Sequence, residues 1–265
     1  MVATFTTVFV NGHQANLRFH YVEQSGKPVK FPGTTSCVGF DPFPGSGFSK
    51  SLKKEGGCQG EGSGATVERL DVQDLRIHPC EEEYACWYQT PGQCFLSDDM
   101  RWVLPKMMAA TLWVIASPLF SVGFPGPLVT LFDRMLPTTL PSLELRDRHS
   151  RIGFRQLKPE GKIALVASCA YWEQDTFDSM IQMIQSVAAT VQREFVGALL
   201  RPGSAVLYPM LESKNPPQDI VEAAHQAGVE LGQTGRIRET ILQAVSRDLM
   251  PRAEYIRFFN EGSLE

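Results

Sequence analysis

Residues Thr111–Arg134 read TLWVIASPLFSVGFPGPLVTLFDR, and this stretch decides the fold. It begins with a short apolar run that ends at Ser117–Pro118 and continues through a loop of aromatic and small residues. Helical spacing then brings five apolar side chains to one face: Phe124, Leu128, Leu131, Phe132 and Met135. Ligands of open α/β sheets bind in the crevice outside the carboxyl ends of the strands. We therefore interpret the loop after Ser117 as one wall of a cofactor site.

Strand-like and helix-like segments alternate on both sides of this stretch. Together with 111–117, five runs have the composition and length of strands, the others being 35–40, 65–72, 161–169 and 194–200. Such alternation implies parallel strands, right-handed crossovers and helices on both faces. Five strands fit the doubly wound order 2-1-3-4-5, which places a ligand at the switch point between strands one and three. The sequence therefore predicts an α/β fold with a doubly wound, five-stranded parallel sheet.

The flanking segments differ in character from this central part. Asn11–Gly12 separates two strand-like runs, which is the usual signal for a β-hairpin. We expect an N-terminal β extension over 1–34, a main α/β domain over 35–212 and a C-terminal helical extension over 213–265. Residues 136–158 are expected to form a long charged connection. Further helices are predicted at 98–110, 175–193, 219–231, 236–247 and 252–259.

Composition excludes several classes of partner and compartment. Of 265 residues, 43% are hydrophobic and the net charge is −4, which gives no electrostatic reason to expect nucleic acid or an anionic membrane. No apolar run approaches the roughly 20 residues that span a bilayer. The N-terminus lacks the pattern of a secretory signal, so the six cysteines are expected to be reduced thiols. We expect a cytoplasmic protein.

Four quoted motifs resemble a known family. They are IHPC, the cysteine-containing run CFLSDDM, then ASPLFSVGFPGPLVTLFDR and GKIALVASCAYWE. These are similar to motifs of the flavodoxin-like NAD(P)H-dependent FMN reductases, a group that includes the iron–sulfur flavoproteins. The resemblance covers about residues 35–205. It implies a flavodoxin-like fold, bound FMN, reduction by NAD(P)H or another electron donor, and a homodimer or homotetramer.

The resemblance also assigns two loops to the flavin ring. In relatives, amides of the loop after strand three hydrogen-bond the N5/O4 edge of the isoalloxazine, and here Phe120 would supply a flat apolar surface. The loop after strand four closes over the other part of the ring. The residues at the corresponding positions are Ser117, Pro118, Leu119, Phe120, Ser121, Gly123, Ser168, Cys169, Ala170 and Tyr171.

A third loop, after strand one, holds the phosphate in relatives. They carry a G-S-P-R-x-x-x-N-T-like loop, whereas residues 39–50 read GFDPFPGSGFSK. Asp41 brings a negative charge and the family's arginine is absent. An anion-binding nest at a helix start can still be formed by Gly45, Ser46, Gly47, Ser49 and Lys50.

The cysteine motif departs from that of the iron–sulfur members. They use C-x2-C-x2-C and a fourth cysteine, because a cubane needs four thiolates. Here Cys80, Cys86 and Cys94 are present, and Glu83 stands in place of the second cysteine. We expect no cluster and a loop packed near the flavin edge. Zinc bound by the three cysteines and His78 is compatible with the ligand types, but the spacing is not that of a known zinc ribbon.

Other notable side chains have a structural and a functional interpretation. Trp113 is expected in the core, whereas Tyr171–Trp172 is expected to line the pocket. An arginine cluster in the 136–158 connection can meet a nicotinamide phosphate or an acidic substrate, although a solvated charged face is the default. The cluster contains Arg146, Arg148, Arg151 and Arg155.

The functional expectation is an FMN-dependent oxidoreductase that moves hydride or electrons from NAD(P)H to a quinone, a flavin or another small electrophile. No catalytic acid or base is expected, since the difficult chemistry belongs to the cofactor. One alternative is a flavodoxin-like module that has lost FMN and acts in binding or assembly. Another is an electron carrier with a metal centre near Cys80–Cys94.

Overall fold

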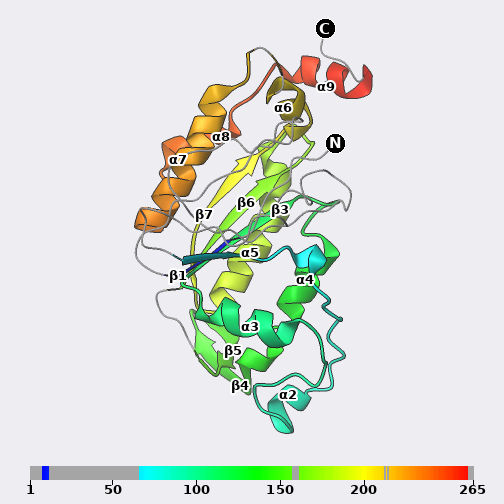
Figure 1. Ribbon diagram of the computed structural model, residues 1–265, viewed down its shortest axis with the longest axis vertical. Coiled ribbons are helices and arrows are strands. Elements are labelled where there is room, and N and C mark those ends of the chain that lie inside the picture. The colour runs from blue at the N-terminus through cyan, green and yellow to red at the C-terminus, as the bar shows by residue number, and fades with distance from the viewer. Residues whose placement is uncertain (1–7, 12–65, 157–160, 212, 214, 262–265) are drawn as a thin grey trace.

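The computed structural model describes residues 8–11, 66–156, 161–211, 213 and 215–261 (Figure 1). Its main sheet has the strand order β2-β1-β3-β6-β7. The central strands β3 (Leu112–Pro118), β6 (Lys162–Ser168) and β7 (Glu194–Arg201) are parallel to one another, as predicted. All seven residues of β3 are buried, which agrees with a strand covered on both faces.

The strand beside β3 differs from the prediction. The expected residues 35–40 lie outside the described part, and β1 (Val8–Asn11) occupies this position. β1 runs antiparallel both to β3 and to β2 (Thr66–Arg69), so the sheet is not parallel throughout. The composition of a buried strand encodes burial rather than direction, so the apolar run of β1 suits a central position in either orientation. The expected domain boundaries stay predictions.

Helices cover both faces of the sheet, and alternate residues of β6 point to the two sides. Ile163 and Leu165 belong to the core that includes residues of α3, α4 and α5, whereas Ala164 and Val166 belong to the core under α7 and α8. Figure 1 shows α7 and α8 along one side of the sheet. None of the helices in the described residues is long and apolar enough to cross a membrane. The helices are α2 (Ala85–Tyr88), α3 (Met100–Ala109), α4 (Gly126–Asp133), α5 (Asp178–Thr190), α6 (Ser204–Leu211), α7 (Gln218–Thr234), α8 (Glu239–Ser246) and α9 (Arg252–Glu261).

The expected connection over 136–158 contains a β-hairpin instead. Strands β4 (Thr139–Arg146) and β5 (His149–Phe154) pair antiparallel, and Arg146 lies opposite His149. The two residues between them, Asp147 and Arg148, have φ angles of 50° and 65°. Two positive φ values are the signature of a tight hairpin turn that sequences usually mark with Asn-Gly. The turn carries no glycine, which is why the sequence did not reveal it.

Trp113, near the start of β3, is buried completely, as predicted. Its indole nitrogen donates a hydrogen bond of 2.7 Å to the carbonyl of Met107. The guanidinium of Arg193 lies 4.0 Å from the ring centroid and donates to the carbonyls of Ala110 and Thr111. Burial lowers the pKa of Arg193 to about 10. This cluster therefore connects the C-terminal end of α3 to the central strand.

Candidate functional site

The carboxyl ends of β3 and β6 bring the two predicted flavin loops together. Pro118 lies opposite Ser168 in the sheet, and the amide of Leu119 donates a 2.8 Å hydrogen bond to the carbonyl of Ser168. This pairing continues the strand register by one residue beyond β3. The sequence placed these loops at one edge, and the structure brings them side by side as predicted.

The first loop, Leu119–Gly123, closes in a tight turn. Phe120 and Gly123 exchange two main-chain hydrogen bonds of 2.9 Å, and Ser121 adopts a φ angle of 50°. The carbonyl of Val122 accepts a hydrogen bond from the hydroxyl of Ser179 in α5. Within the described part of the chain, nothing accepts a hydrogen bond from the amides of Ser121 and Val122. The Phe120 side chain is 40% exposed, so its ring is accessible beside these donors.

The second loop, Cys169–Glu173, is held through consecutive carbonyl groups. The amide of Ser204 donates to the carbonyl of Cys169 at 2.9 Å, and the amide of Gly203 donates to that of Tyr171 at 2.7 Å. The carbonyl of Ala170 accepts from the hydroxyl of Tyr255. All three partners lie in or next to α6 and α9, which Figure 1 shows beyond the arrowheads of β6 and β7.

This arrangement leaves two amides of the second loop available. The peptide bonds are trans, so each amide points away from the carbonyl of the preceding residue. The carbonyls of Cys169 and Tyr171 are directed to the start of α6, so the amides of Ala170 and Trp172 face the other way. No residue in the described ranges accepts a hydrogen bond from them. The two loops together thus offer four main-chain donors, the amides of Ser121, Val122, Ala170 and Trp172.

The two strand-end serines differ in what their hydroxyls can do. Ser117 is fully buried, and its hydroxyl donates 2.9 Å to the carbonyl of Pro118. Ser168 is 1% exposed, and among the described residues its hydroxyl has no hydrogen-bond partner. An unsatisfied buried hydroxyl costs stability, so such a group in a native structure calls for a ligand or a bound water. Of the two predicted serines, Ser168 is the one with free capacity.

Cys169 is buried among these groups and has an unreactive thiol. Burial raises its pKa to about 11, and the main-chain amides of Tyr171 and Gly203 together with the charge of Arg201 offset only part of this effect. A thiol is nucleophilic as the thiolate, which this environment disfavours. The side chain therefore packs under the loop and is no candidate nucleophile.

Alkylation should distinguish Cys169 from the cysteines of the 75–99 loop. At pH 8 in the native protein, we expect iodoacetamide to modify Cys169 at least about tenfold more slowly than the partly exposed Cys80, because the reactive Cys169 thiolate is scarce and buried. Peptide mass spectrometry over time measures both rates. Equal rates in folded protein would contradict the described burial, and unfolded protein, in which the rates should converge, is the control.

The expected phosphate-binding residues Gly45, Ser46, Gly47, Ser49 and Lys50 lie outside the described residues. The Tyr171 side chain is 56% exposed and Trp172 half-buried, so both are accessible to a ligand at the second loop.

The arginine cluster lies elsewhere, on and after the β4–β5 hairpin. Arg146 pairs with Glu144 at 2.7 Å, and Figure 1 places the hairpin at the end of the sheet opposite α6 and α9. The structure therefore does not bring this cluster to the two loops.

Residues 75–99, which carry Cys80, Cys86 and Cys94, form what we call the cysteine loop. It lies at the far end of α4 from the two predicted flavin loops, contrary to expectation. The thiol of Cys94 lies 3.4 Å from Arg134, immediately after α4, whereas Leu119–Gly123 precedes that helix. Eight helical residues separate the two ends by about 12 Å. Burial raises the pKa of the Cys86 thiol, with smaller contributions from the neighbouring Cys94 and Cys80. Nevertheless, the described residues contain no group of three or more side chains able to hold a metal ion.

Arg134 anchors the cysteine loop through a buried ion pair that the sequence did not reveal. Its side chain is 1% exposed and that of Asp98 is fully buried, with Nη1–Oδ2 and Nη2–Oδ1 separations of 2.5 and 3.1 Å. Nη1 also donates to the carbonyl of His78. Burial alone would raise the pKa of Asp98, but hydrogen bonds from Arg134 and the amides of His78 and Met100 lower it overall. The pair is structural and faces no ligand loop.

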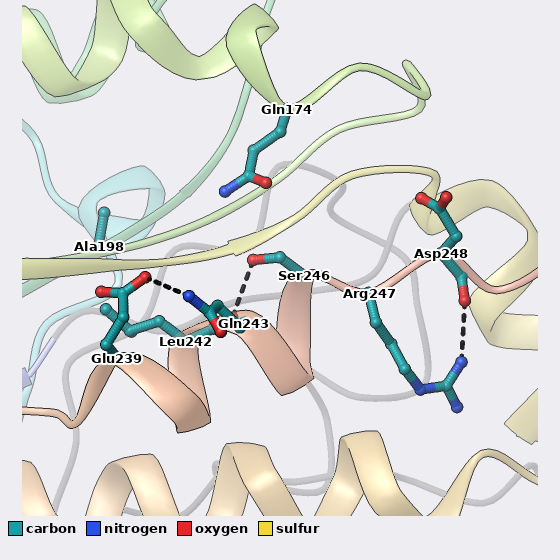
Figure 2. Close-up of a pocket in the computed structure, with 8 residues that line it drawn as sticks. All are labelled: Gln174, Ala198, Glu239, Leu242, Gln243, Ser246, Arg247 and Asp248. Atoms are coloured by element: carbon teal, nitrogen blue, oxygen red, sulfur yellow. Dashed lines mark hydrogen bonds between the residues drawn. The ribbon is translucent and has the colours of Figure 1, made fainter.

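A polar groove of about 350 Å³ lies along the edge strand β7 (Figure 2). Gln174 points into it from the segment before α5, opposite side chains of α8. Several of these groups already bond to one another, as in the 3.1 Å contact between Gln243 and Glu239. The lining residues are Gln174, Ala198, Glu239, Leu242, Gln243, Ser246, Arg247 and Asp248. No residue of the two flavin loops lines this groove.

A match to one protein family agrees with the quoted motifs. Residues 46–200 match the family described as NADPH-dependent FMN reductase. No match is found among curated proteins. Similar solved structures include an FMN-dependent NADH-azoreductase from Bacillus anthracis str. Ames Ancestor in complex with FMN, at 16% identity and a TM-score of 0.44, covering 63% of this chain and 79% of that one. A flavone reductase is 18% identical, with a TM-score of 0.41 and coverages of 70% and 61%. The NAD(P)H:quinone oxidoreductase from Methanothermobacter marburgensis is 16% identical, with a TM-score of 0.39 and coverages of 63% and 80%.

Proposed function

Because the chain belongs to the NADPH-dependent FMN reductase family, we propose that it is an FMN-dependent oxidoreductase that transfers hydride or electrons from NAD(P)H to a quinone, a flavin or another small electrophile. We also propose that it works as a homodimer or homotetramer in the cytoplasm. The four cysteines in the described part are free thiols, which suits a reducing compartment.

The observation that carries the proposal is the pair of adjacent loops with unused amides. An isoalloxazine is a flat ring with nitrogen and oxygen acceptors along its edges. The amides of Ser121, Val122, Ala170 and Trp172 are donors of the kind that such an edge requires. The exposed ring of Phe120 offers an apolar surface beside them. The residues present therefore fit the ring of FMN.

The roles of these groups follow from the chemistry of the cofactor. FMN, when bound, supplies the site that accepts and gives up hydride. The amides of the two loops hold and orient the ring and stabilise negative charge on its acceptor atoms. Phe120 excludes water from one face. Residues 45–50 remain the proposed holder of the phosphate, by resemblance to the family.

Purification provides the direct test. The protein should be yellow, with flavin absorbance bands, or become so on reconstitution with FMN, and it should oxidise NADH or NADPH in the presence of a quinone. Colourless protein that cannot be reconstituted would refute the proposal. FMN binding weaker than millimolar would favour instead the module that has lost its cofactor and acts in binding or assembly.

Replacement of Ser168 by alanine is predicted to raise the stability of the cofactor-free protein and to weaken FMN binding. Ser168→Ala should stabilise the cofactor-free protein by about 1 kcal/mol, because it removes an unsatisfied buried hydroxyl. The same change should weaken FMN binding about tenfold if this hydroxyl bonds the flavin. Urea unfolding and FMN fluorescence titration measure the two effects.

A matched control for this prediction is Ser246→Ala. The Ser246 hydroxyl lies 2.9 Å from the carbonyl of Leu242, so its loss should destabilise the protein by about 1 kcal/mol and leave FMN affinity unchanged. If Ser168→Ala destabilised the cofactor-free protein and left FMN affinity intact, Ser168 would be an ordinary structural serine.

A further inference from the structure

The end of the molecule opposite the flavin loops carries exposed apolar side chains on two elements. α2, in the cysteine loop, contacts β4 of the hairpin, and Figure 1 shows both at the end of the sheet away from α6 and α9. Of the eleven large apolar side chains that are exposed in the described residues, five lie on these two elements. They are Tyr84, Tyr88, Phe95, Leu143 and Leu145. Exposed apolar groups gathered in this way mark a candidate interaction surface.

The two leucines of β4 are the most exposed of this group. Leu143 is 74% exposed and Leu145 is 80% exposed. They stand two residues apart in the strand, so their side chains point to the same face of the hairpin. Among the described strands, β4 pairs with β5 alone. The leucine face is therefore open to a partner.

Hydrogen bonds join the cysteine loop to the hairpin. The indole nitrogen of Trp87 donates to the hydroxyl of Thr139 at 2.8 Å. The guanidinium of Arg155, just after β5, donates to the carbonyl of Cys86 at 3.4 Å and to that of Pro137 at 3.2 Å. These bonds hold the two elements in a fixed relation, so they present one surface to a partner.

The charges of the two elements are opposite in sign. The cysteine loop contains five acidic residues and one arginine, whereas residues 139–154 of the hairpin contain three arginines and two acidic residues. Glu81, Glu82 and Glu83 are consecutive and exposed, and Arg148 is exposed at the hairpin turn. Within the described ranges, none of these four side chains forms an ion pair. Charges of both signs are therefore available for contacts with another molecule.

We propose that the cysteine loop and the hairpin form a dimer interface, in which the acidic loop of each copy packs against the basic hairpin of the other. A twofold axis brings the same two elements of both copies together in reverse order, so the contact is made twice. A second copy is the partner that fits, because one chain carries both halves of the contact. The inference rests on the self-association proposed above, and it places the interface away from the flavin loops.

Leu145→Lys tests the apolar part of the interface. In sedimentation equilibrium, the wild type should be a dimer or a tetramer, and the variant should dissociate into units of half the size. The dissociation constant should rise at least about thirtyfold, because the interface would take the lysine charge out of water. The matched control is Ile256→Lys in α9, whose side chain is 49% exposed at the opposite end of the molecule. It should change the constant by less than about twofold.

An exchange of charges between copies tests the pairing. One double variant, Arg148→Glu with Arg151→Glu, makes the hairpin acidic. The other, Glu81→Lys with Glu83→Lys, gives the acidic run a positive charge. Each variant alone makes both contacts of its homodimer repulsive, so the dissociation constant should rise at least about tenfold. In a one-to-one mixture, a heterodimer has opposite charges at both contacts, and native mass spectrometry should show it in excess over either homodimer.

A monomeric wild type, or an assembly that survives Leu145→Lys, would overturn the interface. So would a mixture without the heterodimer, because the charges would then not face each other across copies. If circular dichroism showed Leu145→Lys to be unfolded, salt provides a test on the wild type. Raising NaCl from about 0.05 to about 0.5 M should weaken the assembly about tenfold, and an unchanged constant would refute the interface. Flavin absorbance of the wild type is measured separately, so this interface and the FMN-dependent chemistry can fail independently.

Discussion

Replacement of Trp113 by alanine is expected to lower the free energy of unfolding by about 4 kcal/mol. The side chain is fully buried near the start of β3, so the variant leaves a large cavity between the sheet and α3. It also deprives the Met107 carbonyl of its 2.7 Å indole partner and exposes the buried face of Arg193. Guanidinium unfolding followed by circular dichroism measures the loss of free energy. In thermal unfolding, the same loss should lower the melting temperature by roughly 10 °C.

Trp102 provides a control of the same chemistry at the surface. Its indole nitrogen donates a 3.0 Å hydrogen bond to Asp99, and Lys106 lies 5.1 Å from its ring centroid, but the side chain is 41% exposed. Trp102→Ala should therefore cost less than about 1 kcal/mol. Equal losses for the two tryptophans would contradict the argument that burial, rather than the polar contacts, decides the effect.

Replacement of Arg134 by alanine should cost about 3–5 kcal/mol, because it leaves the carboxylate of Asp98 buried without its partner. The folded protein lowers the pKa of Asp98, so the contribution of the pair is present above the ordinary pKa of an aspartate and is lost as the pH falls through the folded value. The difference in stability between wild type and variant should therefore shrink in acid. Urea unfolding at pH 7 and at about pH 3 tests both statements.

Two further variants sharpen this experiment. Arg247→Ala breaks an ion pair with Asp219 whose side chains are 41% and 57% exposed, so it should cost at most about 1 kcal/mol. A double replacement of Arg134 and Asp98 by leucines should recover part of the loss, since no charge is then left unpaired. A double variant as unstable as Arg134→Ala would mean that the cost comes from packing or from the lost bond to the His78 carbonyl.

The central strands and their helices were predictable because their sequences carry the period and composition of buried elements. The run 111–117 became β3 and 161–169 became β6, and their parallel pairing follows from alternation with helices. Direction was not predictable for β1, because its composition suits either orientation. The β4–β5 hairpin was missed because Asp147 and Arg148 adopt positive φ angles without a glycine.

The sequence predicted which two loops lie together at the candidate site, but not the side chains that hold these loops in place. Adjacency of the loops after β3 and β6 follows from the fold, and the structure confirms it. The groups that hold these loops, Ser179 and Tyr255, lie on helices whose docking depends on tertiary packing. Likewise, the buried pair between Asp98 and Arg134 joins residues that are 36 positions apart, and neither has a local signal for burial.

The place of β1 in the sheet has a consequence for the order of folding. Lys162 pairs with Leu112 and with Glu194, partners 50 and 32 positions away, so β3, β6 and β7 can assemble through crossovers of modest length. Val8 pairs with Val114, a separation of 106 positions. Contacts of such high sequence separation are slow to form, because the entropy of closing the loop is lost before the pairing is gained. β1 is therefore expected to pair with β3 late, after β3, β6 and β7 have assembled.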